Sequence, residues 1–218
     1  MKTLTTQTVG EVGSTSLERT TVELPTGRTK TVAVVRRPNA IGVLPLLPNP
    51  DGRVDVLLAA QPRPAIADTA LVEVVAGKLD PGETNPEAAA ARELGEEVGL
   101  AAEQWRLLAA SLPVSPGYST EHMTLFACWD LHTVPGRAED AHITSIQIPL
   151  DDAIARIDRG EITDLKTITA LLLTQRQLSE PTRCNACGQL NPDGPTDSAG
   201  RPWCRACTDE AEVSGTPA

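Results

Sequence analysis

The chain has 218 residues, enough for one sizeable core and a small appendage, so its length allows one domain or two unequal ones. A formal net charge of -10 at pH 7 argues against a protein that depends on phosphate-backbone contacts and makes nucleic acid an unlikely partner. The polar, Thr-rich start lacks the apolar region of a signal peptide, and no stretch approaches the ~20 apolar residues of a membrane span, so we expect a cytoplasmic protein without a membrane partner.

Strands dominate the first third of the sequence. Residues 20–35 alternate polar and apolar side chains around the turn residues Pro25 and Gly27, which predicts a β-hairpin. Further strands are expected where short apolar runs are bounded by turn residues: 40–47, 54–60, 71–75, 105–111, 123–131 and 145–149.

Three helices are predicted from residues typical of helix starts and ends. The first opens at Pro86 and ends near Gly99. The second is capped by Asp151 and ends near Gly160, and the third is capped by Thr163 or Asp164 and ends near Leu178. Strands and helices are mixed without a regular βαβ alternation. The fold class is therefore expected to be α+β, as a sandwich of helices and sheet.

The helix from Pro86 carries a cluster of acidic residues. Glu93, Glu96 and Glu97 share one side, and the last two lie in the final turn, where the helix dipole disfavours anions. Arg92 can pair with Glu96, but a bound cation would offset the repulsion further. Carboxylate oxygens favour Mg²⁺ or Mn²⁺, although a merely solvated acidic face is the alternative.

The loop before this helix adds a second pattern. Together they read Gly77-x5-Glu83-x8-Arg92-Glu93-Leu94-x-Glu96-Glu97-x-Gly99-Leu100. This closely resembles the signature of the Nudix hydrolases, except that the family has seven residues, not eight, between the loop glutamate and the arginine. The extra residue falls near Asn85-Pro86, ahead of the helix, so the spacing within the helix is that of the family.

The resemblance implies roles for the helix. Glu93 and Glu97 would be principal ligands of Mg²⁺ or Mn²⁺, and Glu96 a further or water-mediated ligand. Arg92 and Glu83 would support them. Such a metal neutralises the pyrophosphate and lowers the pKa of the attacking water.

The loop has implied roles as well. The Ala76 carbonyl would be a further metal ligand, and the backbone at Gly77 would approach the substrate closely.

Other segments over residues 21–173 resemble the ADP-ribose pyrophosphatase branch. They are Gln61-Pro62-Arg63-Pro64-Ala65, the run from Glu73 to Glu83, Ser115-Pro116-Gly117-Tyr118-Ser119-Thr120-Glu121, and residues 160–167. The resemblance implies an α/β/α sandwich, hydrolysis of ADP-ribose to AMP and ribose 5-phosphate, and a homodimer that exchanges its N-terminal strands. Arg63, Glu73, Tyr118 and Glu121 would contact the substrate.

The general base is expected on an acidic residue late in the sequence, as in that branch. Glu139 is the candidate, with Glu121 in reserve. An ordinary exposed loop charge is the alternative for Glu139.

Four of the five cysteines form two pairs near the C-terminus, Cys184-x2-Cys187-x16-Cys204-x2-Cys207. This spacing predicts a small structural zinc ribbon. Its acidic charge balance favours a structural or protein-contact role. Cys128, alone in an apolar run, is predicted to be a buried and inert thiol.

The domain organisation follows from these patterns: N-terminal strands in 1–37, a catalytic domain in 38–178, the zinc segment in 179–207 and a flexible tail in 208–218. Two alternatives stay open for the function. One is a nucleotide-sugar or NADH pyrophosphatase, and the other is a Nudix-fold binding or regulatory protein with weak or no catalysis.

Overall fold

The computed structural model describes residues 1–134 and 142–179. The chain divides into two units between Leu172 and Leu173; the packing described below is that of residues 1–172, and the last helix continues past this boundary. The expected zinc segment, the tail and Glu139 lie outside the described residues.

A three-stranded antiparallel sheet begins the chain, in the order β1 (Lys2–Val12), β2 (Thr15–Glu23) and β3 (Thr29–Arg36). The predicted hairpin is confirmed as β2 and β3, which turn through Gly27 at a φ of 78°. β1 was not predicted. All its residues are exposed, so it lacks the apolar alternation by which a strand is found.

The second sheet has seven strands and contains the strands predicted between residues 40 and 149, except that the single strand predicted at 71–75 is divided at Val74 into two. They are β4 (Ala40–Pro48), β5 (Val54–Arg63), β6 (Asp68–Glu73), β7 (Val75–Lys78), β8 (Leu100–Pro113), β9 (His122–Thr133) and β10 (Thr144–Pro149). The main order is β10-β5-β4-β9-β8, with β6 beside β5 and β7 beside β4. β4 and β9 pair in parallel, and the other pairs are antiparallel.

The helices are α1 (Pro86–Val98), α2 (Leu150–Asp158) and α3 (Leu165–Ser179), and a 3-10 turn spans Pro64–Ile66. The Asn85 side chain caps α1 by accepting from the amides of Glu87 and Ala88, and Gly99 ends it at a φ of 66°. The predicted cap at Asp151 is wrong: α2 already begins at Leu150, so Asp151 lies in its first turn.

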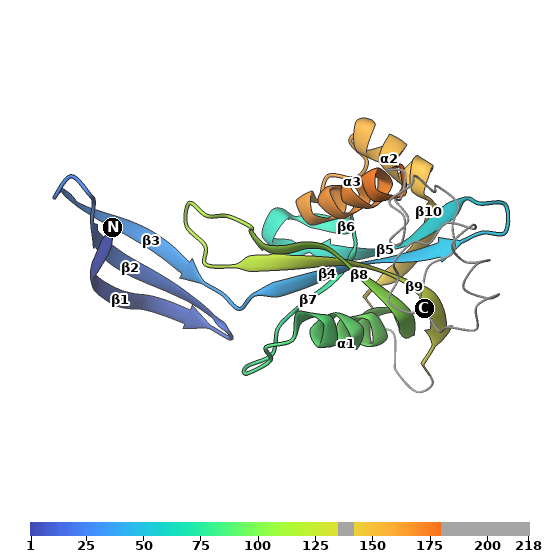
Figure 1. Cartoon of the computed structure of the whole chain (residues 1–218). Coiled ribbons are helices and arrows are strands. Elements are labelled where there is room, and N and C mark those ends of the chain that lie inside the picture. Colours follow the sequence, from blue (N-terminus) through green and yellow to red (C-terminus); the bar gives the residue numbers. More distant parts are fainter. Residues whose placement is uncertain (135–141, 180–218) are drawn as a thin grey trace, which may run out of the picture. The chain divides into compact units, whose positions relative to one another are not determined.

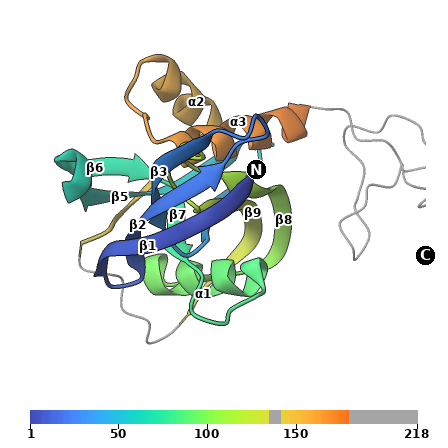
Figure 2. The ribbon, with the colours of Figure 1, turned by 90° about the vertical axis from the view of Figure 1, so that its left-hand side faces the viewer.

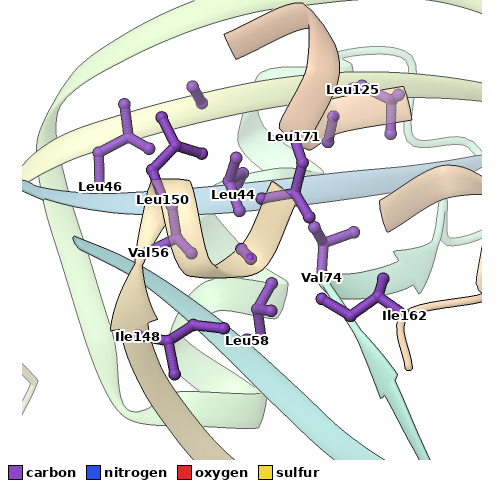
Figure 3. Packing of buried hydrophobic residues seen from close by; sticks show 13 residues of the cluster. Leu44, Leu46, Val56, Leu58, Val74, Leu125, Ile148, Leu150, Ile162 and Leu171 are labelled. Atoms are coloured by element: carbon purple, nitrogen blue, oxygen red, sulfur yellow. The ribbon is translucent and has the colours of Figure 1, made fainter. Parts of the chain in front are cut away.

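The helices cover opposite faces of the second sheet, with α1 on one side and α2 and α3 on the other (Figures 1 and 2). Alternate residues of β4 produce this arrangement. Ile41 and Val43 pack in one apolar cluster with α1, whereas Leu44 and Leu46 pack in a second with α2 and α3 (Figure 3). A strand that is apolar on both faces requires a cover on each, so the chain forms an α/β/α sandwich.

Within the described residues, no helix is long and apolar enough to cross a membrane.

Candidate active site

Glu97 lies at the end of α1 and reaches back to the loop that precedes the helix. Its Oε2 accepts a hydrogen bond from the Ala76 amide at 3.2 Å. Burial raises its pKa to about 7, and the neighbouring charges of Glu93 and Glu73 add to the rise, while the Ala76 amide and Arg63 oppose it. The site therefore holds a carboxylate whose negative charge is poorly compensated by the protein alone.

Glu93 lies one turn before Glu97 and packs on the backbone of Gly77. A Cβ atom at Gly77 would overlap the Glu93 carboxylate, so glycine is needed for this close approach. Burial raises the pKa of Glu93 as well, although Arg92 opposes the rise. Two carboxylates with raised pKa thus border the same short backbone segment, residues 76–77.

Arg92 ties the helix to the loop. Its Nη1 donates to Glu93 and to Glu96, each at 2.9 Å. Its Nη2 donates to the Lys78 carbonyl at 3.0 Å and to Glu83 at 3.3 Å. Glu83 therefore reaches Arg92 in spite of the extra residue between them.

The helix begins at the position where the sequence placed the extra residue. Asn85 caps α1 with its side chain, and Pro86 is the first helical residue, so every position from Arg92 onward keeps its place on the helix face. Glu83 is held from the other side by the Asp80 amide at 2.9 Å, and this contact and Arg92 lower its pKa.

A second charged cluster lies around Glu73, which is only 2% exposed. Its Oε2 accepts from Arg63 Nε at 2.6 Å, and its Oε1 pairs with the Lys166 ammonium. Lys166 also pairs with Asp164 at 3.0 Å. A buried carboxylate is tolerated here because each of its oxygens has a cationic partner.

A cavity of about 580 Å³ joins the two clusters, since Ala76, Gly77, Arg63 and Glu73 all line it. Part of its wall is charged, and the cations on that part are Arg37, Arg63, Lys78 and Lys166. Part is apolar and includes Leu112, Val114, Met123 and Leu165. Its size and its mixed lining suit a small molecule with an anionic portion.

The loop of residues 115–121 contributes one of its two predicted contacts to this cavity. Glu121 lines it and pairs with Arg37 at 3.3 Å. Tyr118 is 58% exposed and is not among the cavity residues found in the described part of the chain. Its carbonyl instead accepts from the Val35 amide at 2.6 Å, which joins the loop to β3.

Most of the predicted site residues in the described part of the chain lie together. Arg63, Glu73, Ala76, Gly77 and Glu121 line the cavity, and Glu93 and Glu97 adjoin its Ala76-Gly77 backbone. Glu96 is more exposed and is held by Arg92.

Arg37, Asp164 and Lys166 had no predicted role, and they complete the charged wall of the cavity. The resemblance of residues 160–167 to the ADP-ribose pyrophosphatase branch is the sequence feature that points to Asp164 and Lys166 as site residues. Within the described residues, no three carboxylate, imidazole or thiol side chains already converge as a metal site.

The chain is similar to known proteins over most of its length. The NUDIX domain model matches residues 36–171. The chain is 32% identical to the methanol dehydrogenase activator of Bacillus methanolicus, over 81% of this chain and 93% of that protein. It is also 32% identical to the ADP-ribose pyrophosphatase of Bacillus subtilis, over 71% of this chain and 81% of that protein. The crystal structure of an ADP compounds hydrolase superposes with a TM-score of 0.70 at 22% identity, covering 81% of this chain and 93% of that one.

These matches define the class: the chain has the Nudix fold, and its glutamate helix and loop occupy the matched region. The chain belongs to the Nudix family of hydrolases.

Proposed function

We propose that this protein hydrolyses the pyrophosphate bond of ADP-ribose to give AMP and ribose 5-phosphate. The observation that carries the proposal is the cavity beside Ala76-Gly77, which adjoins the Glu93 and Glu97 carboxylates and has a cationic wall. Relatives named ADP-ribose pyrophosphatase, from Bacillus subtilis and from Mycobacterium tuberculosis, support the choice of substrate.

The residues fit a divalent cation. Burial removes solvating water from Glu93 and Glu97 and raises the pKa of both carboxylates. A bound cation stabilises such a pair because it compensates their negative charge. We assign Glu93 and Glu97 as principal ligands of Mg²⁺ or Mn²⁺, Glu96 as a further ligand and the Ala76 carbonyl as the loop ligand. The cation supplies charge neutralisation of the pyrophosphate and a water of lowered pKa.

The remaining groups bind and orient the substrate. Arg63 offers its guanidinium to the anionic part of the ligand, and the glycine at position 77 lets the ligand approach the backbone. Arg92 fixes the orientation of Glu93 and Glu96. Glu73 holds Arg63 in place.

The proposed general base is Glu139, with Glu121 in reserve. Glu121 lines the cavity, but its ion pair with Arg37 occupies part of its carboxylate. Substituting each residue by glutamine separates the two, because the kcat of the variant that lacks the base should fall at least about 100-fold. Tyr118 is proposed as a contact to the distal part of the substrate.

The test of the function is release of AMP from ADP-ribose by the full chain with Mg²⁺ or Mn²⁺, beside NADH, ADP-glucose and GDP-mannose. We expect the largest kcat/KM for ADP-ribose. A larger value for another of these compounds would make the protein a nucleotide-sugar or NADH pyrophosphatase. No turnover of any compound would refute the catalytic proposal.

A second candidate role is regulatory. It is motivated by the relative in Bacillus methanolicus, which is named as an activator of another enzyme. In this role the protein would bind a nucleoside diphosphate compound tightly and turn it over slowly. Calorimetric binding of ADP-ribose without release of AMP would favour the regulatory role, whereas multiple turnover would favour the enzyme.

We also propose that Cys184, Cys187, Cys204 and Cys207 hold a structural Zn²⁺ and that the chain forms a homodimer through residues 1–37. Metal analysis of the full chain and of Cys184→Ser tests the first: one zinc per chain, lost in the variant, is expected. Light scattering of the full chain and of a chain that lacks residues 1–37 tests the second.

A further inference from the structure

Lys166 connects the start of α3 to the cavity wall. Its side chain is 14% exposed and its ammonium pairs with two carboxylates, Glu73 and Asp164. Asp164 is itself fixed, because it accepts from the Thr167 amide at 3.0 Å and from the Thr167 hydroxyl at 2.6 Å. Two carboxylates, Glu73 and Asp164, therefore fix the position of the Lys166 ammonium.

The Lys166 contact decides how Glu73 binds Arg63. Since Lys166 occupies Oε1, the Glu73 carboxylate has Oε2 left for Arg63, which binds it through Nε. Among the described residues, the Arg63 guanidinium makes no hydrogen bond other than this one through Nε. The side chain of Arg63 is 38% exposed and lines the cavity.

The two terminal nitrogens of Arg63 thus stay available to a ligand. A guanidinium presents these nitrogens as a planar fork that matches two oxygens of a phosphate. An ammonium in place of Arg63, or an Arg63 turned away from the cavity, would lose this match.

We propose that Lys166 is a positioning residue that keeps the Arg63 fork directed at the diphosphate portion of the substrate. Without Lys166, a Glu73 oxygen would be buried with no partner, which is costly. The Arg63 guanidinium would then turn to bind both oxygens of Glu73 and would withdraw from the cavity. The inference rests on the proposed function for its substrate, but its binding test does not require turnover.

The first test compares Lys166→Met with Lys166→Arg by the kinetics of ADP-ribose hydrolysis. Because Arg63 acts on binding, we expect the KM of Lys166→Met to rise at least about tenfold while its kcat changes less than about threefold. Lys166→Arg keeps a cation for Glu73 and should stay within about threefold of the wild type in both. Arg106→Met, which removes a cation at an exposed site on β8 outside the cavity and outside residues 1–37, is the control.

The second test measures affinity for ADP-ribose by calorimetry in a Glu97→Gln background, where hydrolysis is blocked. Lys166→Met should weaken binding at least about tenfold there as well, and Asp164→Asn, which weakens the anchor of Lys166, by a smaller factor. This readout holds if the wild type binds ADP-ribose but does not hydrolyse it, in which case the proposed function fails and the role of Lys166 stands.

Three results would overturn the inference. One is an unchanged KM and affinity in a folded Lys166→Met. Another is a fall in kcat with KM unchanged, which would place Lys166 in the chemical step. The third is an equal loss of affinity for ADP-ribose in Lys166→Arg and in Asp164→Asn, in proportion to the fall in their melting temperatures. That result would make the cluster purely structural.

Discussion

The Val74 amide donates a hydrogen bond to the Thr167 hydroxyl at 2.8 Å, although the two residues are 93 positions apart. Val74 lies between Glu73 of the cavity wall and the segment 75–77 that borders the glutamates. Thr167 is fully buried in α3, next to Lys166. One hydroxyl thus fixes α3 against the junction between β6, which carries Glu73, and β7, which borders the glutamates of α1.

Thr167→Val is expected to lower the free energy of unfolding by about 1–3 kcal/mol. The substitution keeps the shape but leaves the Val74 amide buried without a partner. Urea unfolding followed by circular dichroism measures the change. Thr163→Val, at an exposed position just before the helix, should be near neutral; a similar loss in both variants would contradict the assignment.

Glu97→Gln is expected to reduce metal-dependent kcat at least about 100-fold, because a principal ligand of the cation loses its charge. Its melting temperature in EDTA should not fall, since burial already opposes the charge of Glu97. Glu87→Gln, an exposed glutamate in the first turn of the same helix, is the control. Equal activity of the two variants would remove Glu97 from the metal site.

Gly77→Ala should separate activity from stability. The new Cβ would collide with the Glu93 carboxylate, which is the free end of a flexible side chain and can move aside. We therefore expect a melting temperature close to that of the wild type and a kcat about 100-fold lower, since Glu93 is displaced. Gly10→Ala, where a Cβ meets nothing within 4 Å, is the control. Full activity of Gly77→Ala would show that the position of Glu93 does not matter.

Arg92→Lys is expected to lower the free energy of unfolding by about 1–3 kcal/mol. A single ammonium cannot make all the hydrogen bonds that the guanidinium donates to Glu93, Glu96, Glu83 and the Lys78 carbonyl. Chemical denaturation gives the value, with Arg19→Lys at an exposed site on β2 for comparison. No difference between the two would mean that Arg92 does not stabilise the loop.

Cys128 should resist alkylation in the native protein. Burial raises the pKa of its thiol to about 12, so at pH 9 the thiol stays protonated, whereas an ordinary thiol would be about half ionised. Peptide mapping after iodoacetamide treatment should find Cys128 unmodified at pH 9 and modified once the protein is unfolded in urea. Native modification at pH 9 would contradict the burial of Cys128.

Local signals predicted α1 and its acidic face well. Pro86 at the start and Gly99 at the end fix the helix by their own backbone preferences, and the order of residues between them sets the face. The prediction that Cys128 is buried is confirmed: it lies on β9, in the apolar cluster that also contains the buried residues of α1. In each case the information lies within a few neighbouring residues.

Other features depend on contacts that a local pattern does not contain. The polar β1 forms a strand because it pairs along β2, not because one of its faces is apolar. Lys166 is part of the cavity because α3 docks on the strand with Glu73, 93 residues earlier in the chain. The contact of Glu83 with Arg92 depends on the path of the loop between them, which the spacing of the two residues does not predict.

The parallel pairing of β4 with β9 also sets an order of events during synthesis. β4 lies in the middle of the second sheet, yet Ala40 pairs with Met123 and Pro45 with Cys128, so one edge of β4 stays open until that later strand has left the ribosome. Such distant pairing slows folding because a long loop must close first. We expect the nascent chain to expose an apolar strand edge until β9, which ends at Thr133, has been synthesised, and this makes it a client for chaperones that bind extended apolar segments.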